Sequence, residues 1–218
     1  MSDIIKKLSN FEHSDSFIQI DTIKGFEYVN RVGEIINKYH KSDLSPPQYM
    51  GGLEGLIIHK PTEEIEEIRL GSQSLWAKFE KRDSMEMILN AFSKESEKVF
   101  NTLSVKHARR IGWRNYFFHE IGDDVKLKKY LEKFTPTKEM NPMGFIFRIE
   151  TKEDFEANLG IQPVVKNGGE KKAFGILFDV DIFYVNKIET NKIKENLKAF
   201  SEYLRDKEGF LKVINNTF

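Results

Sequence analysis

The sequence predicts an α+β protein: mixed or antiparallel strands form sheets, and long amphipathic helices pack on them in two related halves. Strand-like and helix-like segments follow in mixed order, with several strands adjacent along the chain, which argues against a doubly wound fold. The segment ILNAFSKES at 88–96 is echoed by ENLKAFSEY at 195–203. Each echo follows an apolar, strand-like run, at 74–79 in the first case and at 173–185 in the second.

Residues 1–138 are the first predicted half. Tyr28, Val32 and Ile35 recur at helical spacing, so residues 25–40 are predicted to form an amphipathic helix. The other elements follow from apolar alternation, helical spacing and capping residues. They are a helical arm at 4–8, strands at 16–22, 55–59, 64–70, 74–80 and 106–119, a helix ending at Leu103, and a short helix capped by Asp123 or Asp124.

Residues 139–218 are the second predicted half, because prolines at 136 and 142 bracket a boundary. Apolar runs predict strands at 144–150 and 173–185, with an exposed turn at Asn167-Gly-Gly between them. Ile193, Leu197 and Phe200 lie on one stripe of a final helix at 191–206. The two halves are expected to pack intimately, as two domains or as one.

Composition sets the size of the core and excludes several chemistries. The 218 residues are 39% hydrophobic and include 18 phenylalanines, enough for a substantial core. Lys plus Arg and Asp plus Glu both total 34, so no global field draws the chain to nucleic acid or a membrane. The absence of cysteine excludes disulfides and thiolate chemistry. No apolar run has the length of a signal peptide or a membrane span, so we expect a cytoplasmic protein with no membrane partner.

A strand rich in arginine is the first candidate site. Alternation places Arg110, Arg114 and Tyr116 on one face, while Trp113 lies on the other. Gly112, between the arginines, leaves room for a close approach to the backbone. The guanidinium groups could bind phosphate or carboxylate. They could instead form a cross-strand ion ladder, which we favour because strand arginines are usually paired with acidic neighbours.

A strand with two carboxylates is the second candidate site. Asp179 and Asp181 share one face, opposite an apolar face. Two such carboxylates can hold divalent metal ions in phosphoryl-transfer enzymes. A third carboxylate and a Gly-Ser helix start are not evident, so we favour pairing with Arg110 and Arg114 in a structural ion network. We therefore predict no catalytic residue, no metal and no cofactor. If the protein is an enzyme, Asp179 and Asp181 are the expected metal ligands.

The segment Arg110-Ile-Gly-Trp-Arg114 resembles the Arg-Ile-Gly-Leu-Arg-Tyr-Ile-Asn signature of a sporadically distributed, uncharacterised bacterial family. In that family, as here, a strand and an amphipathic helix precede the signature, and an Asp-x-Asp strand precedes a C-terminal helix. Asn115, Tyr116 and Phe117 depart from the signature. The resemblance implies a shared fold over residues 15–218 and no known catalytic activity. The patchy distribution of the family implies mobile-element or defence gene neighbourhoods.

Three functions stay open. The first, which we favour because no specific catalytic motif is found, is a non-catalytic interaction or accessory protein that binds a protein partner or itself. The second is a metal-dependent phosphoryl-transfer or nucleic-acid-processing enzyme that uses Asp179 and Asp181, with Arg110 and Arg114 on phosphate. The third is a nucleic-acid-binding module, based on the aromatic and basic residues of the Trp113 strand. The zero net charge weighs against the third.

Overall fold

The structure, a computed structural model, describes residues 12–22, 26–40, 48–49, 55–80, 85–132, 144–149, 151, 154–168 and 171–205. The strands are β1 (Glu12–Thr22), β2 (Gln48–Tyr49), β3 (Leu56–His59), β4 (Glu67–Leu70), β5 (Ser74–Glu80), β6 (His107–Gly122), β7 (Phe145–Ile149), β8 (Glu156–Gly168), β9 (Lys171–Tyr184) and β10 (Ile188–Glu189). The helices are α2 (Phe26–His40), α3 (Met85–Leu103), α4 (Asp124–Leu131) and α5 (Ile193–Arg205), and a 3-10 turn, Thr190–Lys192, precedes α5.

These strands form one sheet in the order β2-β3-β4-β5-β1-β6-β9-β8-β7, with β10 pairing β6. Every pairing among the described strands is antiparallel. The predicted α+β class is therefore confirmed. The central pair is β1 and β6, in which Ile18 lies opposite Trp113 and Phe17 lies opposite Arg114. Because side chains alternate, the first pair faces one side of the sheet and the second pair faces the other.

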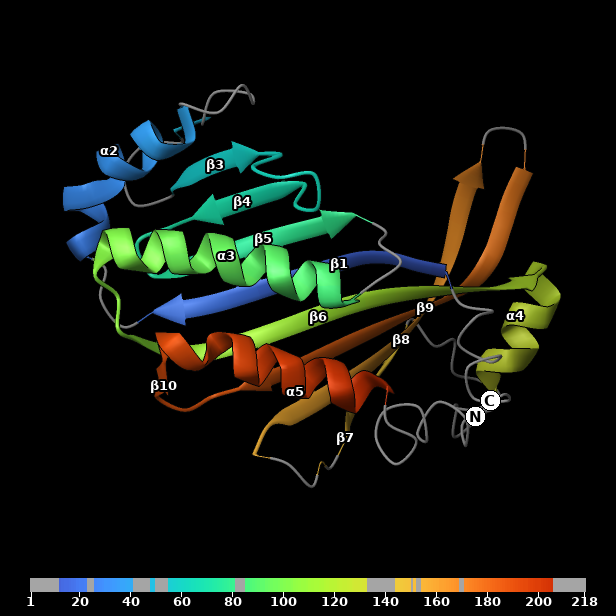
Figure 1. Cartoon of the computed structure of the whole chain (residues 1–218). Helices are drawn as coiled ribbons and strands as arrows, with labels where there is room; N and C mark the ends of the chain where they lie inside the picture. Colours follow the sequence, from blue (N-terminus) through green and yellow to red (C-terminus); the bar gives the residue numbers. More distant parts are fainter. Residues whose placement is uncertain are drawn as a thin grey trace.

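Helices α3 and α5 lie side by side over one face of the sheet (Figure 1). Both bury their apolar stripes against it, and Phe92 of α3 and Phe200 of α5 are fully buried. The ring of Phe92 meets Phe79 of β5 edge-on, with centroids 6.3 Å apart. The ring of Phe200 stacks on Tyr184 of β9 at 5.4 Å. The core therefore lies between this helix pair and the inner strands of the sheet.

The order of elements along the chain occurs twice. Among the described elements, the run β1, α2, β2, β3, β4, β5, α3 is followed by the run β6, α4, β7, β8, β9, β10, α5, and each run is a strand, a helix, four strands and a helix. In the sheet, β1 and β6 are adjacent and β5 and β9 flank them. Strands β4, β3 and β2 continue outward from β5, strands β8 and β7 continue outward from β9, and β10 pairs with β6. The change from one run to the next falls between Leu103 and His107. The boundary expected at residues 138 and 139 and the helical arm at 4–8 lie outside the described residues.

Strand β8 is the longest element that the sequence did not predict, and the two-residue strands β2 and β10 were not predicted either. Strand β8 contains Gly160 and Pro163, both of which disfavour the interior of a strand. The structure accommodates Pro163 because β7 pairs with β8 only from Ala157 to Ile161, so the proline lies beyond the end of that ladder. On its other side, Pro163 lies opposite Ile176 of β9. A proline in a strand that is paired on one side costs no ladder hydrogen bond when its nitrogen faces outward.

Truncating either buried phenylalanine of the echoed helices tests this core. Phe92→Ala and Phe200→Ala should each lower the free energy of unfolding by about 3–5 kcal/mol, because each leaves a cavity among buried rings. Chemical denaturation measures the loss. Met87→Ala, on the same helix as Phe92 but 49% exposed, should change stability by no more than about 0.5 kcal/mol. A loss below about 1 kcal/mol in either phenylalanine variant would place that ring outside the core.

Candidate functional site

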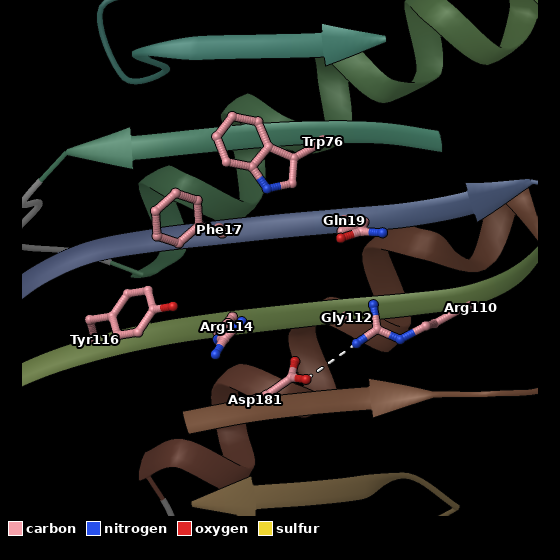
Figure 2. A pocket seen from close by; sticks show the side chains of 8 residues that line it. All are labelled: Phe17, Gln19, Trp76, Arg110, Gly112, Arg114, Tyr116 and Asp181. Atoms are coloured by element: carbon pink, nitrogen blue, oxygen red, sulfur yellow. Dashed lines mark hydrogen bonds and ion pairs between the residues drawn. The ribbon is translucent and has the colours of Figure 1, made fainter. Parts of the chain in front are cut away.

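The face of the sheet opposite α3 and α5 carries polar and aromatic side chains over its four central strands, β5, β1, β6 and β9. Figure 2 shows this face with helices behind the strands. Trp76 of β5 and Phe17 of β1 are half-buried here, whereas their neighbours Leu75 and Ile18 are buried on the helix side. The alternation of each strand therefore directs its aromatic side chain away from the main core. We call this surface the open face.

A hollow lies on the open face above Gly112 of β6. Gly112 is opposite Gln19 of β1 and opposite Phe183 of β9, and Arg110 and Arg114 flank it along its own strand. The side chains around Gly112 surround a depression of about 250 Å³. We call it the Gly112 pocket. It is lined by Phe17, Gln19, Trp76, Arg110, Gly112, Arg114, Tyr116 and Asp181.

Three aromatic rings from three adjacent strands form one side of the Gly112 pocket. The ring of Phe17 lies 5.2 Å from Trp76 with an interplanar angle of 31°. It lies 5.6 Å from Tyr116, nearly perpendicular to it. Figure 2 shows Trp76 and Phe17 side by side with their rings seen face-on. They therefore form a shallow aromatic platform, and Tyr116 borders it.

Arg114 and Asp179 form the tighter of the two arginine–aspartate pairs between β6 and β9. Nε of Arg114 donates to Oδ1 of Asp179 at 2.6 Å, and Nη2 donates to Oδ2, so the contact is bidentate. The Asp179 side chain is 9% exposed and that of Arg114 is 49% exposed. A half-exposed guanidinium group thus covers a buried carboxylate. This hydrogen bonding raises the pKa of Arg114 above its ordinary value.

Arg110 and Asp181 form the looser pair. Nη2 of Arg110 donates to Oδ2 of Asp181 at 3.3 Å, and the guanidinium carbon lies 5.0 Å from the centre of the Phe183 ring. Burial raises the pKa of Asp181, although Arg110 and Arg114 act to lower it. One nearby guanidinium contact therefore does not fully compensate the charge of this carboxylate.

Two glycines make room for these pairs. A Cβ atom at Gly112 would lie 2.8 Å from Nη1 of Arg110. The space above Gly112, which the sequence predicted to be open for a close approach to the backbone, is therefore occupied by the Arg110 side chain. A Cβ atom at Gly160 of β8 would lie 3.1 Å from Cβ of Asp179. Alanine at Gly112 would therefore push the guanidinium group of Arg110 away from Asp181.

The structure brings Arg110, Arg114, Asp179 and Asp181 together on one face of neighbouring strands. Trp113 lies elsewhere: it is fully buried on the helix side, where its Nε1 donates to Oγ of Ser16 at 2.6 Å. Tyr116 lies beside the arginines, as its strand position predicts, but the pocket also contains Phe17 and Trp76, which the sequence did not single out. Their positions could have identified them, because both residues alternate with the core-facing residues of the strands at 16–22 and 74–80.

No protein-family model matches the chain, and no curated protein matches it. The resemblance carried by Arg110–Arg114 therefore stays a prediction. Within the described ranges, no three His, Asp or Glu side chains form a group that could hold a metal ion. The helices of the described part are also too short or too polar to span a bilayer.

Removing the guanidinium group of Arg114 should expose the cost of burying Asp179. Arg114→Met keeps an aliphatic chain but leaves the carboxylate without its bidentate partner. We expect a loss of about 2 kcal/mol in urea denaturation at pH 7, less than for a fully buried pair because Arg114 is half-exposed. Arg148→Met, which breaks an ion pair exposed on both sides, should cost about 0–1 kcal/mol. Adding Asp179→Ala to Arg114→Met should restore part of the loss. Equal losses in Arg114→Met and Arg148→Met would contradict the assignment.

Asp181→Asn should change how stability depends on pH. The folded-state pKa of Asp181 lies above the ordinary aspartate value of about 3.9, so the folded protein binds this proton more tightly than the unfolded chain does. The wild type should therefore gain stability relative to the variant as the pH falls through the raised pKa, and the gain is complete below about pH 4. Paired denaturation curves at pH 7 and near pH 4 measure it. A relative loss on acidification would mean that Arg110 outweighs burial.

Proposed function

We propose that the protein is a non-catalytic binding or accessory protein that recognises its partner through the open face. The observation that carries the proposal is the Gly112 pocket, where aromatic rings and two guanidinium groups converge. Aromatic side chains and arginine are the residues most enriched where proteins bind their partners. The four central strands hold these side chains on a rigid sheet, so little conformational entropy is lost when a partner binds.

The state of the two carboxylates favours this proposal over the metal-dependent enzyme. Both oxygens of Asp179 accept hydrogen bonds from Arg114, and Asp181 accepts one from Arg110. A divalent cation would have to displace these guanidinium groups and then sit beside their positive charges. These contacts support a structural ion network. Coulomb repulsion by the arginines opposes a two-carboxylate metal site here.

We also propose that the runs β1 to α3 and β6 to α5 are related halves. Their common order of elements and the Ala91-Phe92-Ser93 and Ala199-Phe200-Ser201 echo support this. The Gly112 pocket then lies where the halves meet, because β5 and β1 supply its platform while β6 and β9 supply its charged side. Ligand sites are common at such junctions. The resemblance of the Arg110–Arg114 signature extends the proposal to an accessory role in a bacterial mobile-element or defence system.

Affinity capture with matched variants tests the proposed function. Immobilised wild type should retain a specific partner, or a second copy of itself, from a lysate of its source cells. Lys198→Ala, on the exposed side of α5, should retain the same partner. Trp76→Ala should lose it, because the aromatic platform is broken while the helix side is unchanged.

Two outcomes would contradict the proposal. One is equal capture by the wild type and Trp76→Ala, which would place binding elsewhere on the molecule. The other is a rise in melting temperature with manganese that disappears in Asp181→Ala, which would favour the metal-dependent enzyme.

A further inference from the structure

We infer that the Gly112 pocket binds a nucleotide, with its base on the aromatic platform and its phosphate at Arg110 and Arg114. This inference rests on the proposed function, because it names the ligand class of the same face. A nucleotide combines a planar heteroaromatic ring, polar ring edges and a negative charge. The pocket presents a complementary group for each of the three.

The platform of Trp76 and Phe17 suits the faces of a base. Both rings lie on the face of the sheet that points away from the main core, where packing of the core does not require an aromatic side chain. Their planes are inclined to each other by 31°, and Figure 2 shows them side by side over adjacent strands. The guanidinium carbon of Arg69 lies 5.0 Å from the centre of the Trp76 ring, so a base that stacks on Trp76 shares that ring with Arg69 or displaces it. Proteins that bind unpaired nucleotides stack bases on aromatic side chains of this kind, displayed on the surface of a sheet.

The two arginines keep donors for a phosphate. Of the guanidinium nitrogens of Arg110, only Nη2 hydrogen-bonds to another described residue, which leaves Nε and Nη1. Arg114 uses Nε and Nη2 on Asp179 and keeps Nη1. Guanidinium groups bind phosphate oxygens through several such donors at once. A phosphate that binds these remaining donors leaves the contact between Arg110 and Asp181 in place, so the carboxylate keeps its partner.

The polar side chains of the pocket suit the edge of a base. Gln19 donates through Nε2 to Asp21, and its Oε1 can accept a hydrogen bond from a base amino group. Oδ1 of Asp181 makes no hydrogen bond to another described residue, because Arg110 contacts Oδ2, and it can accept one from a base in the same way. Unpaired bases are read through hydrogen bonds of this kind to their edges.

The size of the pocket limits the ligand to one nucleotide unit. A volume of about 250 Å³ holds one ring system, and the sugar and phosphate then lie at its open side. The zero net charge of the chain gives no support to a long phosphate backbone. A free mononucleotide and an unpaired nucleotide in a single strand share this chemistry, and the experiment below distinguishes them.

Calorimetric titrations with the four ribonucleoside 5′-monophosphates, the matching nucleosides and inorganic phosphate test the inference. The wild type should bind at least one monophosphate, and more tightly than either the nucleoside or phosphate alone. Trp76→Ala should weaken binding about 10-fold or more, and Trp76→Phe should restore most of it. Arg110→Gln should weaken the monophosphate by about 10-fold or more but leave the nucleoside unchanged. Arg148→Gln, which lies outside the pocket, should behave as the wild type.

Titrations with single-stranded hexanucleotides of RNA and DNA distinguish a free mononucleotide from a nucleotide within a single strand as the ligand. An affinity at least 10-fold above that of the best monophosphate assigns the pocket to a single strand, and an equal affinity assigns it to a free nucleotide. The inference is wrong if no monophosphate and no hexanucleotide binds at millimolar concentration, or if Trp76→Ala and Arg110→Gln both bind as the wild type does. If a protein partner is nevertheless captured in a Trp76-dependent way, the proposed function stands and only the ligand class fails. Circular dichroism confirms that each variant is folded, and Arg110→Gln still tests the pocket if Trp76→Ala unfolds.

Discussion

Strands β1 and β6 meet at the centre of the sheet, and both the core and the Gly112 pocket depend on the register of this pair. A buried polar chain at one point of the ladder holds the register. Nε1 of Trp113 donates to Oγ of Ser16, which in turn donates to Oδ1 of Asn115 at 2.9 Å. A slip of one residue would break this chain and leave buried polar groups unpaired. It would also turn Trp113 toward the open face and the arginines toward the helices.

The same register connects the two faces energetically. On the helix side it sets Ile18 against Trp113 under α3 and α5, and on the open side it sets Phe17 against Arg114. Strand β9 then brings Asp179 and Asp181 beside the arginines through its own ladder with β6. Apolar burial on one side therefore fixes the positions of charged groups on the other. This explains how ion pairs that contribute little by themselves can be held in a defined geometry.

Part of this arrangement could be predicted from the sequence. Period-two alternation was sufficient to place Arg110 with Arg114 and Asp179 with Asp181, and to separate Trp113 from them. Alternation depends only on residues next to one another in the sequence, however, whereas the neighbours of a strand in a sheet can come from distant parts of the chain. Nothing within β1 or β5 shows that Phe17 and Trp76 lie beside Arg114, because that contact depends on pairing between distant segments. Strand β8 was missed for the opposite reason. Pro163 is a local signal against a strand, but β7 does not pair with this part of β8, so the proline is tolerated there.

The change from the first run of elements to the second, between Leu103 and His107, has a consequence for the covalent chain. Only residues 104–106 connect α3 to β6, and Ser104 there has a positive φ of 55°. Within the described ranges, the two runs are also joined by the β1–β6 ladder and by contacts of α3 with α5 and with the turn Thr190–Lys192. Proteolytic cleavage in this connection would leave two fragments, each with a long, unpaired edge strand. Such fragments would reassemble by complementation, and the stability of the cleaved protein would depend on its concentration as that of a heterodimer does.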